Sequence, residues 1–236
     1  MILLSESPAQ ARVERLRSDG SLPNFSGDAL VMILGLTGGI ASGKSTVAEC
    51  FVECGAVLVS ADQLAREVVN PGSPSLAKLV DLFGMDILTA GGSLDREIMA
   101  QKVFADPEAR KMLESATHPA IAHLAECRLA DLSKAPHDLI VYEAPLLFEA
   151  GGERRVDQIL VVVVDPAVQL QRLIERDALS ETDAMQRITT QWPQADKVQK
   201  ADYVIDNSGP LENTRNLVAA LYDYLTRRRN PGLSVS

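Results

Sequence analysis

With 236 residues, the chain is long enough to bury one substantial hydrophobic core and to carry smaller modules beside it. Its content of 46% hydrophobic and 23% charged residues is typical of a soluble globular protein, and its net charge of −9 argues against broad, sequence-independent binding to nucleic acid. No apolar run approaches the ~18 residues of a membrane-spanning helix, so we expect no membrane partner. The three cysteines have no metal-binding spacing and favour reduced interior thiols, which fits a cytoplasmic protein.

The N-terminal part of the chain, residues 1–31, carries no group of side chains with an evident chemical role. Its pattern permits a short helix over residues 8–17, followed by a turn-rich segment at 21–28. We expect residues 1–31 to form an extension outside the core of a domain at 32–229. Residues 230–236 would form a tail.

The first chemical motif lies between a predicted strand at residues 32–36 and a predicted helix that begins at Lys44. The sequence Gly38-x-x-x-x-Gly43-Lys44-Ser45 has the spacing of a Walker A phosphate-binding loop. Glycines let consecutive backbone N–H groups surround a phosphate, and the N-terminus of the following helix attracts the same anion. Lys44 can then reach the β- and γ-phosphates of a nucleoside triphosphate, and the Ser45 hydroxyl can bind Mg²⁺. The predicted phosphate-binding residues are Gly38, Gly39, Ile40, Ala41, Ser42, Gly43, Lys44, Ser45 and Thr46.

A carboxylate follows the second predicted strand, residues 56–60. This residue, Asp62, comes at the carboxyl end of the strand, where parallel sheets bind their ligands. Taken alone, Asp62 is better explained as the N-cap of a helix at 63–69. A phosphate-binding loop one strand away favours a catalytic role instead.

Three helical patterns come next, at residues 75–83, 95–104 and 107–132, without a strand between them. A simple βαβ crossover does not contain three helices in a row. We therefore predict a helical insertion, about residues 63–137, that binds the phosphoryl acceptor. Pro119 should kink the longest helix, which either directs His118 into a cleft or leaves it packed beside the kink.

Two further acids follow predicted strands. The strand at residues 138–143 ends in Glu143, which has the position of a Walker-B-like acid and is a candidate for indirect binding of Mg²⁺. A strand at 158–164 consists mainly of valine and other apolar residues, which indicates burial on both faces. Asp165, which follows it, is better explained as a helix N-cap before Pro166 than as a metal ligand.

The segment between the fourth and fifth predicted strands is rich in arginine. It is either a solvated charged face or a mobile lid over transferring phosphates, and the presence of a phosphate-binding loop favours a lid at about residues 172–200. A fifth strand at 201–205 is followed by Asn207, and a last helix covers 212–227. The candidate lid arginines are Arg172, Arg176 and Arg187.

In this order the elements predict an α/β P-loop NTPase or kinase fold, a five-stranded parallel sheet flanked by helices with a helical insertion and a short lid. Six segments, spread over about residues 32–226, together resemble the dephospho-CoA kinase family. They are Leu-Thr-Gly-Gly-Ile-Ala-Ser-Gly-Lys-Ser-Thr at 36–46, Ala-Asp-Gln-Leu-Ala-Arg-Glu-Val-Val at 61–69, His118-Pro119, Pro-Leu-Leu-Phe-Glu at 145–149, Arg-Leu-Ile-Glu-Arg-Asp at 172–177 and Ala-Asp-Tyr-Val-Ile-Asp-Asn-Ser-Gly at 201–209.

The resemblance implies transfer of the γ-phosphoryl group of ATP to the ribose 3′-hydroxyl of dephospho-CoA, with Mg²⁺ as the metal ion and CoA and ADP as products. One departure is visible, because the family usually has Asp-Ala-Asp where this chain has Ser60-Ala61-Asp62. The resemblance also implies roles for single residues: Asp62 accepts or orients the hydroxyl proton, Arg66 and His118 bind the acceptor, Arg172, Arg176 and Arg187 belong to the lid, and Asn207 lies near adenine.

Two other functions are alternatives to this one: a kinase that acts on a different acceptor, and a nucleotide-dependent switch. Another small-metabolite or nucleoside monophosphate kinase would share the phosphate-binding loop but not the position of the helical insertion. A GTP-dependent switch would need a guanine-reading Asn-Lys-x-Asp segment, which the sequence lacks.

Overall fold

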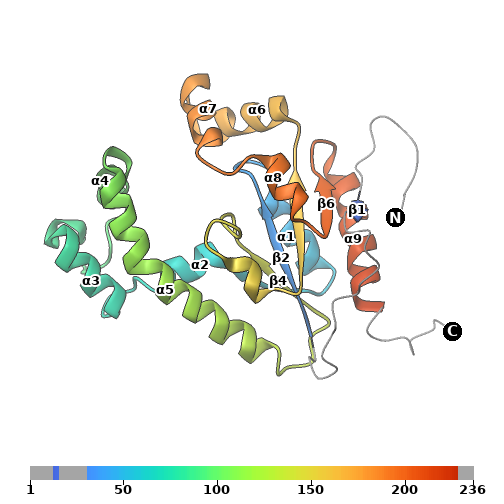
Figure 1. The fold of residues 1–236 in the computed structure, drawn as a ribbon, viewed down its shortest axis with the longest axis horizontal. Coiled ribbons are helices and arrows are strands. Elements are labelled where there is room, and N and C mark those ends of the chain that lie inside the picture. The colour runs from blue at the N-terminus through green and yellow to red at the C-terminus, as the bar shows by residue number, and fades with distance from the viewer. Residues whose placement is uncertain (1–12, 16–30, 228–236) are drawn as a thin grey trace. The chain divides into compact units, whose positions relative to one another are not determined.

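The computed structural model describes residues 13–15 and 31–227, and the chain divides into two compact units. One unit comprises residues 1–59 and 131–236, and the other comprises residues 60–130 (Figure 1). Within the described parts of the chain, no helix has the length and apolar character needed to cross a bilayer.

A six-stranded sheet forms the centre of the first unit, in the order β1–β6–β5–β2–β4–β3. β2 pairs in parallel with β4 and β5, and β5 pairs in parallel with β6. The predicted five-stranded parallel sheet is therefore confirmed, and β1 adds a further, antiparallel strand beside β6. The strands are β1 (Val13–Arg15), β2 (Met32–Gly38), β3 (Val57–Ser60), β4 (Leu139–Glu143), β5 (Gln158–Val163) and β6 (Tyr203–Asp206).

The helix predicted over residues 8–17 is wrong at residues 13–15, which form β1. Without β1, β6 would be the edge of the sheet with a row of unpaired N–H and C=O groups, and a short antiparallel strand satisfies them. Part of the N-terminal extension therefore joins the sheet instead of lying outside it. The predicted turn-rich segment at 21–28 and the tail at 230–236 lie outside the described residues.

The main core lies between the sheet and two helices, α1 (Lys44–Glu53) and α9 (Leu211–Arg227). Alternate side chains of the strands point to this face, because successive side chains of a strand alternate between the two faces of a sheet. Phe51 of α1 is fully buried there, and complete burial of such a side chain contributes about 1.5–3 kcal/mol. This packing holds α1 in place, and the phosphate-binding loop is attached to its first residue. The strand residues of this core include Leu34, Leu36, Leu139, Val141, Leu160 and Val162.

Three helices connect β5 to β6 and contain the predicted lid. They are α6 (Pro166–Asp177), α7 (Glu181–Thr189) and α8 (Gln194–Gln199). The Asp165 side chain accepts hydrogen bonds from the backbone N–H groups of Ala167 and Val168, so its interpretation as a helix cap is confirmed. A short 3-10 helix, η2 (Gly152–Arg155), precedes β5.

The second unit consists of helices around a core of its own. Their apolar faces meet at a buried cluster that includes Leu79, Ile87 and Met99. An ion pair between Arg128 and Glu67, 3.0 Å long, joins α2 to α5. The elements are α2 (Ala61–Glu67), α3 (Pro74–Phe83), the 3-10 helix η1 (Met85–Ile87), α4 (Arg96–Ala105) and α5 (Pro107–Leu132).

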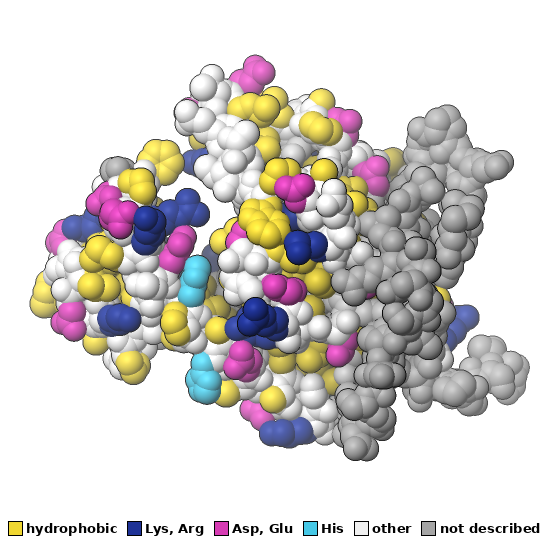
Figure 2. All heavy atoms as spheres, viewed as in Figure 1, with side chains coloured by type: hydrophobic (Ala, Val, Ile, Leu, Met, Phe, Trp, Pro, Cys, Tyr) yellow, Lys and Arg dark blue, Asp and Glu magenta, His cyan; other side chains and the backbone are white. Residues whose placement is uncertain are grey.

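Charged side chains of both signs are interspersed on the face that Figure 2 presents, among the described residues. This distribution differs from the continuous basic surface that non-specific binding to nucleic acid requires.

Candidate phosphoryl-transfer site

The loop between β2 and α1 has a backbone conformation suited to an anion. Ala41 has a φ of 56° and Gly43 a φ of 83°, both in the left-handed region. Left-handed residues beside right-handed ones turn consecutive N–H groups to the same side of the chain, which creates a concave anion site. A residue with a Cβ rarely adopts this conformation, and such strain is typical of ligand-binding turns.

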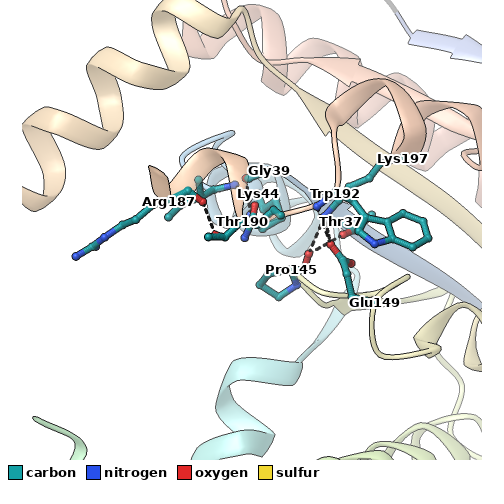
Figure 3. Close-up of polar contacts among 11 residues, drawn as sticks. Thr37, Gly39, Lys44, Pro145, Glu149, Arg187, Thr190, Trp192 and Lys197 are labelled. Atoms are coloured by element: carbon teal, nitrogen blue, oxygen red, sulfur yellow. Dashed lines mark hydrogen bonds and ion pairs between the residues drawn. The ribbon is translucent and has the colours of Figure 1, made fainter. Parts of the chain in front are cut away.

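Two buried side chains of the loop between β2 and α1 carry hydrogen-bond donors. Lys44 is buried, and its Nζ donates a hydrogen bond of 2.9 Å to the Gly39 carbonyl oxygen (Figure 3). The Ser42 hydroxyl is fully buried and has no hydrogen-bond partner among the described residues. A buried hydroxyl without a partner costs free energy, and the oxygen of a bound phosphate would satisfy it.

Asn207 supports the loop from the end of β6. Its Nδ2 donates a hydrogen bond of 2.9 Å to the Ser42 carbonyl oxygen, and its Oδ1 accepts one of 2.8 Å from the Thr214 hydroxyl. The residue is buried. The sequence placed Asn207 at the correct edge of the sheet but missed this structural role, and its predicted position near adenine stays a prediction.

Gly43→Ala tests this support. A Cβ at this position would overlap the Asn207 side-chain amide, and the φ of +83° is strained for alanine. Because such strain alone costs of order 1–3 kcal/mol, we expect the affinity for ATP to fall about ten-fold or more. Isothermal titration calorimetry measures the affinity. Gly72→Ala is the matched control, since Gly72 has the same φ and open space around it; equal affinities in the two variants would contradict this account.

Two glutamines of the segment between β5 and β6 bind the apex of the loop, and one of them, Gln191, lies within the predicted lid. The Ile40 backbone N–H donates a hydrogen bond of 2.7 Å to Gln191 Oε1, and Gln169 Nε2 donates one of 2.8 Å to the Ile40 carbonyl oxygen. Both polar groups of Ile40 are therefore bonded to the segment between β5 and β6. These two contacts could not be predicted from the sequence, because neither Gln169 on α6 nor Gln191 in the turn after α7 belongs to a phosphate-binding motif.

Ser45 and Glu143 provide oxygen atoms suited to Mg²⁺. The Ser45 hydroxyl donates a hydrogen bond of 3.2 Å to Glu143 Oε1, as expected when β4 lies in parallel beside β2. Mg²⁺ in phosphoryl-transfer sites takes one or two protein oxygens together with phosphates and water, so this pair fits the ion. Residues 13–15 and 31–227 contain no group of three or more His, Cys, Asp or Glu that could hold a metal ion by itself.

The three arginines predicted to belong to a lid differ in position. Arg172 is half-buried, and its Nη1 lies 3.9 Å from the place that a Cβ on Gly43 would take. Arg176 and Arg187 are exposed and both donate to Asp177, at 2.8 Å and 3.0 Å. Hydrogen bonds from Arg176, followed by the charges of both arginines, hold the pKa of Asp177 below its ordinary value.

The structure thus brings Arg172 to the phosphate-binding loop but not Arg187, which points away from Lys44 in Figure 3. Exposed ion pairs such as Arg187–Asp177 contribute little to stability, roughly 0–1 kcal/mol. A multiply charged phosphate can therefore displace Asp177 from these arginines.

The remaining predicted residues lie in the second unit. Asp62 is exposed in the first turn of α2, whose N-cap is Ser60, so the alternative interpretation of Asp62 as the N-cap is wrong. Arg66 is exposed in the last turn of the same helix. His118 is exposed on α5 beside Pro119. The catalytic and acceptor-binding roles of these three residues stay predictions.

Residues 32–213 match the family model described as dephospho-CoA kinase. The chain belongs to the dephospho-CoA kinase family. A dephospho-CoA kinase of Syntrophotalea carbinolica is 54% identical over 191 residues, which cover 81% of this chain and 90% of the relative. A dephospho-CoA kinase of Geobacter metallireducens is 46% identical over 192 residues, which cover 81% of this chain and 96% of that relative. The family and enzyme class that the sequence predicts, a kinase, are confirmed.

Two solved structures have the same fold as this dephospho-CoA kinase family member. A dephospho-CoA kinase from Campylobacter jejuni has a TM-score of 0.67 and 28% identity, with 84% of this chain and 99% of that chain covered. TT1252 from Thermus thermophilus has a TM-score of 0.66 and 37% identity, with coverage of 81% and 97%.

Proposed function

We propose that the chain transfers the γ-phosphoryl group of ATP to the ribose 3′-hydroxyl of dephospho-CoA, giving CoA and ADP, in the cytoplasm. The observation that carries this proposal is the phosphate-binding loop, with its buried Lys44 and a buried Ser42 hydroxyl that has no hydrogen-bond partner in the described part of the chain, in a member of the dephospho-CoA kinase family.

Phosphoryl transfer demands alignment and charge neutralisation more than bond-making to the protein. The loop amides and Lys44 bind the phosphates and neutralise their charge, and Arg172 adds a cation at the same loop. Ser45 would hold Mg²⁺ directly and Glu143 through water, and the bound ion would neutralise the β- and γ-phosphate oxygens. Asn207 stabilises the conformation of the loop through its hydrogen bond to the Ser42 carbonyl oxygen.

On the acceptor side, Asp62 orients the 3′-hydroxyl group and accepts its proton, as a carboxylate that follows the carboxyl end of a parallel strand can do. Arg66, one turn later on α2, and His118 on α5 bind the phosphate and ribose region of dephospho-CoA.

Release of ADP from ATP, measured with and without dephospho-CoA, tests the function. We expect release only when dephospho-CoA and Mg²⁺ are both present, and mass spectrometry of the product should show one added phosphate at the ribose. A panel of nucleoside monophosphates and small alcohols serves as the control. Equal ADP release with another acceptor, or without any acceptor, would refute the assignment.

A further inference from the structure

A lysine and a glutamate without an assigned role form a buried ion pair close to the phosphate-binding loop. Lys197 on α8 is 0% exposed, and its Nζ lies 2.9 Å from Glu149 Oε1. The same Nζ donates a hydrogen bond of 3.3 Å to the Pro145 carbonyl oxygen (Figure 3). Glu149 is 19% exposed and follows β4 in the chain.

Burial of an ammonium group is unfavourable unless partners replace its water. Such a pair is weak evidence for stability, because apolar residues of similar size often give the same or higher stability. An ion pair is directional, however, and can specify one arrangement of the groups around it. The role of the ion pair can therefore be inferred from the segments of the chain that Lys197 and Glu149 hold together.

On one side, the pair reaches the ends of β2 and β4. The Pro145 carbonyl that Lys197 binds also accepts a hydrogen bond of 3.3 Å from the Thr37 hydroxyl. Thr37 directly precedes the phosphate-binding loop, and Pro145 comes shortly after Glu143, the candidate partner of Mg²⁺. One carbonyl oxygen thus connects Lys197 to both the phosphate-binding and the metal-binding parts of the site.

On the other side, the pair lies against the return segment of the predicted lid, which we define as residues 190–199. Trp192 stacks on Phe148 with 6.1 Å between ring centroids and 9° between planes. The Trp192 backbone N–H also donates to Glu149 Oε1, at 3.5 Å. Its neighbour Gln191 accepts the hydrogen bond from the Ile40 N–H at the apex of the phosphate-binding loop.

We propose that Lys197 and Glu149 are positioning residues whose ion pair holds the return segment of the lid against the phosphate-binding loop and the Glu143 end of β4. The pair acts through Gln191, which fixes the Ile40 peptide, and through Pro145, which fixes the chain after Glu143. The kinetic part of this proposal rests on the proposed function.

Single and double variants of the pair separate positioning from stability. Lys197→Met and Glu149→Gln should each lower kcat by about 10- to 100-fold, since misplacement of reacting groups by an ångström has effects of this size. The affinity for ATP should stay within about three-fold, because Lys44 and the loop amides still bind the phosphates.

The double variant Lys197→Met/Glu149→Leu leaves no uncompensated charge in the interior, so its thermal unfolding midpoint should return towards that of the wild type. Its kcat should remain as low as in the single variants, because the directional pair is still missing. Recovery of kcat together with stability would overturn the proposal. Lys200→Met is the matched control, since Lys200 is exposed at the end of the same helix and should have wild-type kcat.

Fluorescence provides a readout that is independent of the acceptor. Trp192 is the only tryptophan of the chain, and its emission in the ligand-free protein should shift in the double variant as the stack on Phe148 loosens. Unchanged emission would also overturn the proposal. If the wild type fails to phosphorylate dephospho-CoA while the emission shifts as expected, the proposed function fails and the positioning of the return segment stands.

Discussion

Replacement of Lys44 by alanine is expected to abolish phosphoryl transfer, with a loss of kcat of about 10³-fold or more even when both substrates are saturating. Lys44 is the buried cation of the loop, and its Nζ is held by the Gly39 carbonyl oxygen within the curve of backbone N–H groups. Without it, the charge that develops on the β- and γ-phosphates in the transition state lacks its nearest fixed positive partner. ADP release at saturating ATP and dephospho-CoA measures the effect.

Lys78→Ala is the control, because Lys78 is an exposed lysine on α3 and carries no proposed role. Both variants should unfold at nearly the wild-type temperature. Appreciable turnover in folded Lys44→Ala would contradict the assignment of residues 38–46 as the phosphate-binding loop.

Asp62→Asn should lower kcat by about 10²- to 10⁴-fold, the range in which loss of a positioned general base usually falls. An amide has the shape of the carboxylate but cannot accept the proton of the 3′-hydroxyl group. The affinity for ATP should barely change, because the proposed phosphate-binding residues, 38–46, belong to the other unit. Single-turnover phosphorylation of dephospho-CoA, combined with calorimetric titration of ATP, separates the two quantities.

Asp81→Asn provides the comparison, since Asp81 is an exposed acid in the same helical unit without a proposed role. Wild-type kcat in Asp62→Asn would exclude Asp62 as the base. A parallel loss of ATP affinity would mean that Asp62 takes part in nucleotide binding.

Much of the site follows from local sequence. The phosphate-binding loop was predictable because its residues are consecutive, and the backbone conformation that it needs depends on glycines at fixed spacing. Glu143 was predictable for a related reason: parallel strands end at one edge of a sheet, so an acid at the end of β4 lies beside Ser45. The cap at Asp165 depends on Pro166 next to it and was predicted correctly.

Asp62 is a residue whose position in its helix could not be predicted from the local sequence. Asp62 before an apolar helical pattern fits an N-cap as well as a base, but α2 begins earlier than predicted and Ser60 takes the cap position. Helix boundaries are decided by hydrogen bonding in the folded chain, which the sequence pattern locates only to within about two residues. The strand β1 was missed because its pairing depends on the exposed edge of β6 and not on its own three residues.

The sequence alone determined the phosphate-binding loop, the acid at the end of β4 that lies beside Ser45, and the order of strands and helices of the dephospho-CoA kinase family. The tertiary structure alone decided which side chains support these elements. Asn207 binds the Ser42 carbonyl across 165 positions of the chain, and Lys197 on α8 pairs with Glu149 in the turn after β4. The physical reason is that a side chain's hydrogen-bond partner is set by close packing in three dimensions, whereas residue spacing reports only neighbours along one strand or helix.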